Sequence, residues 1–138
     1  MTHVLVAAHA GLSKSLIVSS ELIMGSRPNV HFVEFVTGIT IDTLTARFFE
    51  VFLRLEQEDK LLILVDVYGG SVGNVAASFI SRLALEDRQR CECISGVNLS
   101  MLLTALELRE DLALSDLKEA CYRRGKEAIR DIKQEFKL

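Results

Sequence analysis

The sequence has little of several features that mark particular classes of protein. Only three of its 138 residues are cysteine, and Cys91 and Cys93 are separated by one residue, whereas redox and zinc motifs use two. The thiols are therefore expected to be reduced. No apolar stretch is long enough to cross a membrane, and the first residues lack the basic region and the cleavage site of a secretion signal. We expect a cytoplasmic protein.

The chain also lacks an excess of positive charge. It has 16 Lys and Arg against 19 Asp and Glu, mixed along the sequence, for a formal net charge of -3. Because no basic stripe is present to contact a phosphate backbone, nucleic acid is not expected as a partner. Neither the spaced-glycine dinucleotide fingerprint nor the P-loop lysine motif occurs, which argues against a flavin- or nucleotide-binding protein. We expect no metal and no cofactor, since a His/Asp metal site would lack a third ligand.

The residues that are abundant indicate an α/β protein. Hydrophobic residues make up 49% of the chain and the mean hydropathy is +0.27, which is typical of a buried parallel sheet covered by helices on both faces. The length fits one domain over residues 1–138. Four cycles of an apolar strand followed by an amphipathic helix are visible, without a linker or a low-complexity tract.

The apolar patterns predict where these elements lie. Strands are expected at about residues 3–8, 30–36, 61–65 and 90–95, and helices at about 13–24, 41–57, from 71, 100–108 and 116–136. Gly25 and Pro28, the single proline, end the first helix. Thr40, Ser71 and Ser115 are the expected N-caps of the later helices.

The last predicted helix carries apolar residues at helical spacing. Ile129, Ile132 and Phe136 continue the pattern of its first half, so we expect them to face the core.

Two polar side chains follow predicted strands at the point where each strand ends. His9 comes after Val4–Ala8, and Asp66 comes after Leu61–Val65. The carboxyl ends of parallel strands meet at one edge of a sheet, so the imidazole and the carboxylate are expected close together. The turn at residues 96–98 reaches the same edge.

This pairing suits phosphoryl transfer. A neutral imidazole nitrogen attacks phosphorus when the other ring nitrogen carries the proton, and a carboxylate that accepts that N–H fixes the tautomer. His9 is therefore the candidate nucleophile and Asp66 the orienting group. The backbone N–H groups of Gly69, Gly70 and Ser71 are candidate donors to the phosphoryl oxygens.

Each residue also has an ordinary structural explanation. A histidine after a strand is commonly only a loop residue, and Asp followed by Gly-Gly is common turn chemistry. Ser71 is also expected as a helix cap. His3 and His31 lack a carboxylate at an equivalent strand end, and we interpret both as structural.

Taken together, the loops resemble the enzyme IIA domain of the mannose-type (mannose/fructose/sorbose) phosphoenolpyruvate-dependent sugar phosphotransferase system. The resemblance spans nearly the whole chain in three ordered segments, at residues 4–9, 64–77 and 94–102. It implies a flavodoxin-like, mostly parallel sheet with helices on both faces. It also implies phosphorylation of His9, with Nε2 as the modified nitrogen, and a hydrogen bond from its imidazole to Asp66. Ala10 and Val72-Gly73 depart from the residues that are usual in the family.

The resemblance further implies partners. His9 would accept a phosphoryl group from the small carrier HPr and pass it to a IIB protein, with transported sugar as the final acceptor and an indirect association with a membrane sugar permease. Leu12, Tyr68 and Asn98 are the expected partner-facing residues. A homodimer is implied, in which an antiparallel edge strand is exchanged between subunits; the sequence alone does not locate that strand.

Two other functions remain open from the sequence. One is the phosphotransfer subunit of a phosphoenolpyruvate-dependent dihydroxyacetone kinase, although residues 96–102 favour the sugar-transport branch. The other is a regulatory binding module whose association with a transporter or a transcription regulator is switched by phosphorylation of His9.

Overall fold

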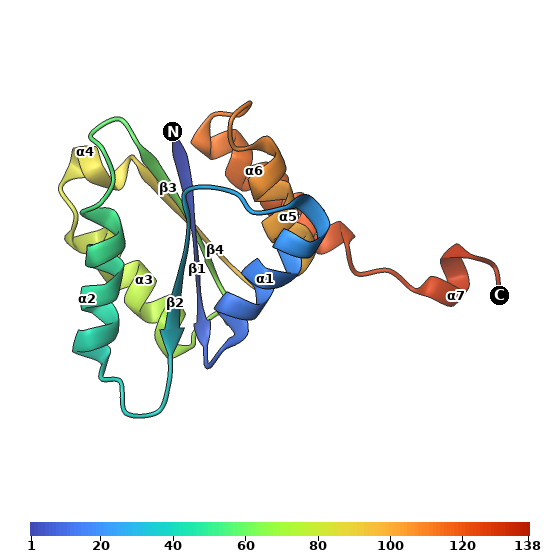
Figure 1. Ribbon diagram of the computed structural model, residues 1–138, viewed down its shortest axis with the longest axis horizontal. Coiled ribbons are helices and arrows are strands. Elements are labelled where there is room, and N and C mark those ends of the chain that lie inside the picture. Colours follow the sequence, from blue (N-terminus) through green and yellow to red (C-terminus); the bar gives the residue numbers. More distant parts are fainter.

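The computed structural model describes residues 1–138 and has strands and helices alternating along the chain (Figure 1). In order, the elements are β1 (Thr2–His9), α1 (Leu12–Met24), β2 (Val30–Phe35), α2 (Ile41–Phe52), β3 (Lys60–Val65), α3 (Ser71–Arg82), α4 (Leu85–Arg88), β4 (Cys91–Ser95), α5 (Leu99–Leu108), α6 (Leu114–Glu127) and α7 (Ile132–Glu135).

The strands form one sheet in the order β2-β1-β3-β4, and every neighbouring pair is parallel. β1 and β3 lie at the centre, where Val4–Ala8 and Leu61–Leu64 are completely buried. Their continuous apolar runs follow from this position, because both faces of a central parallel strand are covered. The predicted α/β class and flavodoxin-like architecture are confirmed.

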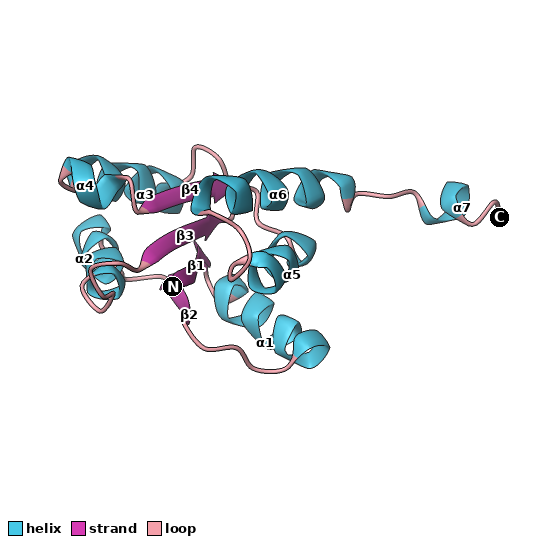
Figure 2. Cartoon of the chain, turned by 90° about the horizontal axis from the view of Figure 1, so that it is seen from above, coloured by secondary structure: helices cyan, strands magenta, loops and turns pink.

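Helices cover both faces of the sheet (Figure 2). On one face α2 and α3 pack through Phe48 and Phe79, whose ring centroids lie 5.8 Å apart. On the other face α5 and α6 bury Leu102 and Leu117, and α1 packs against the same core through Leu16 and Ile17. Fully burying a side chain of this size contributes roughly 1.5–3 kcal/mol, so these two cores hold the three layers together.

The helix caps agree with the sequence in part. Thr40 is the N-cap of α2, and its hydroxyl accepts a hydrogen bond from the Thr43 N–H, as predicted. At α3, however, Gly70 is the N-cap and Ser71 is the first helical residue. The α6 helix begins at Leu114 with Ala113 as its N-cap, so the prediction that Ser115 caps it is wrong.

Two predicted helices extend too far. The α2 helix ends at Phe52 and not near residue 57. After Phe52 the backbone forms tight turns, in which the Arg54 N–H donates to the Val51 carbonyl and the Leu55 N–H donates to the Phe52 carbonyl. Acidic residues at 56 and 58 also oppose the helix dipole at a carboxyl end.

The α6 helix ends at Glu127 and not near residue 136, and the rest of the chain extends away from the body before the single turn of α7 (Figure 1). Ile129, Ile132 and Phe136 are 85%, 67% and 72% exposed, so the prediction that they face the core is wrong. Their spacing is helical, but the two sheet faces are already covered and no surface of this chain lies beneath them.

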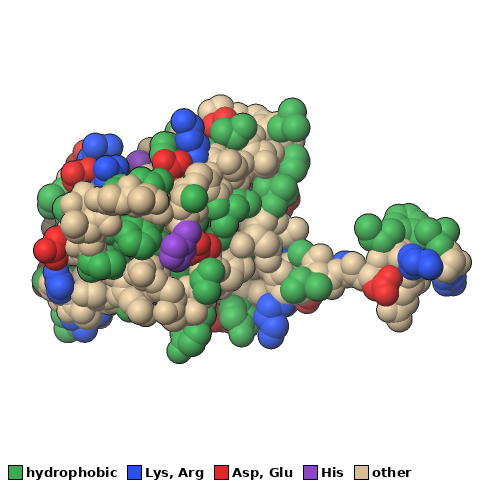
Figure 3. All heavy atoms as spheres, turned by 90° about the horizontal axis from the view of Figure 1, so that it is seen from below, with side chains coloured by type: hydrophobic (Ala, Val, Ile, Leu, Met, Phe, Trp, Pro, Cys, Tyr) green, Lys and Arg blue, Asp and Glu red, His purple; other side chains and the backbone are tan.

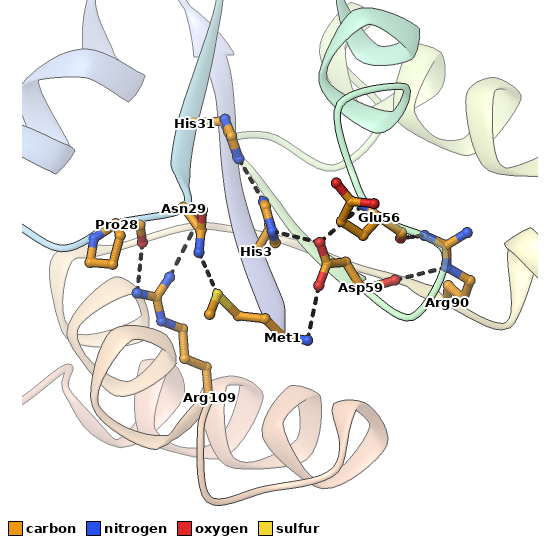
Figure 4. A network of polar contacts seen from close by, with 9 residues as sticks. All are labelled: Met1, His3, Pro28, Asn29, His31, Glu56, Asp59, Arg90 and Arg109. Carbon is orange, nitrogen blue, oxygen red and sulfur yellow. Dashed lines mark hydrogen bonds and ion pairs between the residues drawn. The ribbon is translucent and has the colours of Figure 1, made fainter.

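A polar network occupies the end of the sheet where the strands begin (Figure 4). His3 in β1 and His31 in β2 are joined by a 3.0 Å hydrogen bond between Nδ1 and Nε2, and His3 Nε2 lies 3.2 Å from a carboxylate oxygen of Asp59. Arg109 reaches the same end and donates to the carbonyls of Pro28 and Asn29. These contacts tie the loop before β2 and the loop before β3 to the start of β1.

None of the helices combines the length and the apolar character that spanning a membrane requires.

Candidate functional site

The candidate site lies where β1 and β3 end side by side. Ala7 pairs with Val65 in the sheet, so His9, the last residue of β1, and Asp66, the first residue after β3, lie at the same edge. The Nδ1 atom of His9 lies 2.7 Å from Oδ2 of Asp66. The structure thus brings together the two side chains that the strand ends predict to be neighbours.

Asp66 is held by three hydrogen bonds. Its Oδ2 accepts from the His9 backbone N–H at 2.9 Å as well as from the ring, and its Oδ1 accepts from the Val67 N–H at 2.9 Å. Burial would raise the pKa of Asp66, but the bonds from His9 and Val67 outweigh it, so that the pKa lies below its usual value. Asp66 is therefore an ionised, fixed acceptor at neutral pH.

This acceptor determines which nitrogen of His9 is available. An ionised carboxylate only accepts hydrogen bonds, so in the neutral imidazole Nδ1 carries the proton and Nε2 keeps its lone pair. The His9 side chain is 44% exposed, against 6% for Asp66. On the face where the strands end, a histidine lies at the surface beside an acidic side chain and near hydrophobic side chains (Figure 3).

The loop between β3 and α3 lies beside the imidazole. Gly69 adopts a positive φ of 77°, which favours glycine, and Gly70 approaches the ring so closely that a Cβ built on it would be 3.3 Å from His9 Cε1. The first α3 amide with a backbone acceptor is that of Asn74, which donates to the Gly70 carbonyl. The amides of the first turn, beginning with Ser71, thus point out of the helix end next to His9.

β2 contributes a residue that the sequence did not single out. Phe35 is paired with His9 in the sheet, and its ring centroid lies 5.6 Å from that of the imidazole at an interplanar angle of 66°. The Phe35 carbonyl also accepts a hydrogen bond from the Ala10 N–H at 2.9 Å. Ala10 itself has a positive φ of 51°, an uncommon conformation for a residue with a side chain.

The expected partner-facing residues differ in their surroundings. Leu12 is 45% exposed at the start of α1 and Tyr68 is 90% exposed on the β3–α3 loop. The Asn98 side chain is used within the chain, because Oδ1 accepts from the Met101 N–H and Nδ2 donates to the Gly125 carbonyl. It caps α5 and joins that cap to α6.

A groove of about 740 Å³ runs from Tyr68 along α3 to the unpaired edge of β4. Ile80, Cys93 and Ser95 are among its lining residues. No group of three His, Cys, Asp or Glu side chains is arranged to hold a metal ion.

A parallel α/β sheet with an accessible, carboxylate-oriented histidine at its carboxyl edge defines a class of proteins suited to chemistry on an imidazole nitrogen. Comparison with known proteins identifies the family within that class. Residues 3–122 match the model of the EIIA-man family, described as the PTS system fructose IIA component, and the chain belongs to this family.

Individual relatives agree with this assignment. The chain is 40% identical over 117 residues to the PTS system fructose-specific EIIA component of Bacillus subtilis, a match that covers 85% of this chain and 77% of the relative. It is 29% identical over 131 residues to the PTS system mannose-specific EIIAB component of Escherichia coli, where the match covers 94% of this chain but only 39% of the longer protein.

The fold has close counterparts among solved structures. The phosphotransferase system component EIIA from Streptococcus agalactiae superimposes with a TM-score of 0.88 over 97% of this chain and 99% of that one, at 24% sequence identity. The sugar-system relatives do not favour the dihydroxyacetone kinase alternative.

Proposed function

We propose that this protein is a phosphocarrier of a sugar phosphotransferase system, in which His9 accepts a phosphoryl group from the phosphohistidine of HPr and passes it to a IIB component. Family membership supports the phosphocarrier role in sugar uptake. The observation that carries the assignment to His9 is the 2.7 Å contact between its Nδ1 and the ionised Asp66, which leaves Nε2 free at the surface.

In the proposed step the lone pair of His9 Nε2 attacks the phosphorus atom. A new N–P bond forms as the N–P bond to the donor histidine breaks, and the bonding electron pair returns to the donor ring. The proton on His9 Nδ1 stays in its hydrogen bond to Asp66, whose negative charge stabilises the positive charge that develops on the imidazole. Discharge to IIB is the same exchange in reverse, so His9 ends each cycle in its starting state.

The β3–α3 loop is proposed to bind the transferred group. Gly69 and Ser71 supply backbone N–H donors, and the start of α3 adds the positive end of the helix dipole. The N–H of Gly70 is directed at the Val67 carbonyl with a long 3.3 Å separation, so it is the weakest internal bond of the loop and the easiest to redirect toward a phosphoryl oxygen. Such donors stabilise the charge that is spread over the three equatorial oxygens in the transition state.

HPr and IIB are proposed to dock over this edge of the sheet. Leu12 at the start of α1 and Tyr68 on the β3–α3 loop offer exposed side-chain area, and the loop that contains Asn98 follows β4 at the same edge. A shallow rim of this kind suits transient contacts with two successive proteins. We propose that the chain works in the cytoplasm and reaches the membrane only indirectly, through the sugar permease that IIB serves.

We also propose a homodimer. β4 pairs only with β3, so one edge of the sheet presents unpaired backbone groups beside the groove along α3. Ile129, Ile132 and Phe136 lie exposed on the segment that extends from the body. The exchange of an antiparallel strand would bring this segment of one subunit against the β4 edge of the other, which covers both features at once.

Labelling tests the phosphocarrier role. Incubation with phosphoenolpyruvate, enzyme I and HPr is expected to place one acid-labile, base-stable phosphate on the protein, which peptide mapping assigns to His9. The His9→Ala variant removes the acceptor and should stay unlabelled, while His31→Ala, which changes a histidine far from the site, should be labelled as wild type. Labelling of His9→Ala would overturn the assignment.

A further inference from the structure

Resting on the proposed function, we propose that Phe35 and Gly70 are positioning residues for the transfer. Together they clamp the imidazole of His9 so that Nε2 points at the incoming phosphorus. In this role both residues act through the ring, and the contact of Gly70 with the imidazole is separate from the backbone N–H that Gly70 offers to a phosphoryl oxygen.

A clamp is needed because Asp66 restrains only one ring atom. The hydrogen bond to Nδ1 fixes the tautomer, but apart from its covalent bond to Cβ this is the ring's single polar restraint, and rotation about the side-chain bonds still displaces Nε2. With its side chain 44% exposed, His9 lacks the dense packing that holds core side chains in place. Its orientation must come from a few specific neighbours.

Phe35 is one of these neighbours. It lies opposite His9 in the parallel pairing of β1 and β2, and the 66° angle between the rings is close to the edge-to-face arrangement that aromatic pairs favour. The Ala10 N–H donates to the Phe35 carbonyl, so the backbone at this strand end is fixed relative to the chain that leaves His9. Phe35 therefore supports the ring from the β2 side.

Gly70 lies against the imidazole ring of His9 on the α3 side. Its backbone, with φ -78° and ψ 168°, is one that any residue adopts, so backbone conformation does not explain the glycine. Contact does explain it, since an added Cβ would lie 3.3 Å from His9 Cε1 and 3.5 Å from the Val67 carbonyl oxygen. Because Cε1 is bonded to both ring nitrogens, a push on Cε1 moves Nε2 directly.

Matched substitutions separate the loss of ring positioning from a general loss of stability. Gly70→Ala is compared with Gly11→Ala: both glycines are helix N-caps with negative φ, but a Cβ on Gly11 would meet nothing within 4 Å. Phe35→Leu is compared with Phe32→Leu, which removes a ring from the same strand at a position 46% exposed. Phe35→Tyr keeps the ring and serves as the conservative rescue.

Two phosphoryl donors are used with each variant, phospho-HPr and the small molecule phosphoramidate. Gly70→Ala and Phe35→Leu are expected to lower the single-turnover rate at saturating phospho-HPr by roughly 10- to 100-fold with little change in the half-saturating concentration, as expected for a displaced reacting atom. The rate with phosphoramidate should fall by a similar factor, because a displaced Nε2 slows attack on either donor. Phosphoramidate does not dock as a protein, so a docking defect would not affect its rate. Gly11→Ala, Phe32→Leu and Phe35→Tyr should remain within about twofold of wild type.

The outcomes are decisive in both directions. Rates for Gly70→Ala and Phe35→Leu that match their controls would overturn the positioning role, as would a loss confined to phospho-HPr, which would instead indicate a docking role. If wild-type His9 accepts no phosphate from either donor, the proposed function fails. The clamp is then judged by NMR relaxation of the His9 Cε1–H group, whose motion should increase in folded Phe35→Leu and remain unchanged if the clamp does not exist.

Discussion

At the scale of single residues, the surroundings of Asp66 make it a hydrogen-bond acceptor only. Three N–H groups point at its two oxygens, and the bonds they donate hold its pKa low although burial opposes ionisation. A group surrounded in this way has little freedom to rotate or to take up a proton. The tautomer of His9 therefore depends on this single carboxylate.

Replacing Asp66 by Asn tests that dependence. The amide has one acceptor oxygen for three donors, so either His9 or Val67 faces an NH₂ group, and the imidazole is free to adopt the wrong tautomer. We expect the transfer rate to fall by roughly 10²- to 10⁴-fold, as when the orienting carboxylate of a catalytic histidine is made neutral. Single-turnover labelling measures this loss.

Asp59→Asn is the matched control, since Asp59 also contacts a histidine but at the opposite end of the sheet. Its transfer rate should equal that of wild type. Equal rates for Asp66→Asn and Asp59→Asn would remove Asp66 from the mechanism.

The sequence predicted part of this site. His9 and Asp66 could be paired from the sequence because each directly follows an apolar run, and parallel strands end at a common edge. Phe35 could not be assigned in the same way, because its contact with His9 depends on β2 lying beside β1, which the apolar pattern does not reveal. The contact of Gly70 with the ring was equally hidden, since Gly-Gly is typical of any tight turn.

At the scale of elements, the pair of buried His3 and partly buried His31 joins the starts of β1 and β2. The ring planes of His3 and His31 differ by only 3°, and the bond between them needs one donor and one acceptor nitrogen. Asp59 accepts from Nε2 of His3, so Nδ1 of His3 is the acceptor for His31. Burial lowers the pKa of His3 despite the opposing effect of Asp59, and burial followed by repulsion from His3 lowers that of His31.

This network predicts a pH dependence of stability. Both histidines take up protons more readily in the unfolded chain than in the folded protein, so the free energy of unfolding should fall as the pH drops below the unfolded value of about 6.5. The loss continues until the pH reaches the lowered pKa values of the folded state. Urea unfolding between pH 8 and pH 5 measures it.

A variant carrying His3→Gln and His31→Gln removes both titrating groups. Its free energy of unfolding should change less than that of wild type over the same pH range, whatever its absolute stability at pH 8. If the free energy of unfolding changes equally with pH in the two proteins, the histidine pair does not cause the pH dependence.

The sequence predicted the strands and helices correctly where burial within this chain determines the apolar pattern. Each strand predicted from an apolar run is present, because the central strands are covered on both faces. The last helix was predicted too long because the spacing of Ile129, Ile132 and Phe136 shows only that a face is apolar. It does not show whether a partner for that face lies within the chain.

At the scale of the whole molecule, the apolar segment beyond α6 and the unpaired edge of β4 are two features that a partner subunit would cover. Removing residues 129–138 should leave the stability of the individual subunit within about 0.5 kcal/mol of wild type, since surface residues contribute little. The same truncation should convert the proposed dimer into a monomer. Analytical ultracentrifugation distinguishes the two states.

The matched control replaces Lys133 and Lys137 by Ser, which alters the same segment but keeps its apolar side chains. This variant should remain dimeric. A full-length chain that sediments as a monomer, or a truncated chain that still dimerises, would contradict the proposed exchange.

The most direct test of the account is to find which atom carries the phosphate. We would phosphorylate the ¹⁵N-labelled protein with phospho-HPr and record ³¹P–¹⁵N correlations together with the ring-proton spectrum. Phosphorus is expected to be bonded to Nε2 of His9, with Nδ1 still protonated and hydrogen-bonded to Asp66. Phosphorus on Nδ1, or on any residue other than His9, would contradict it.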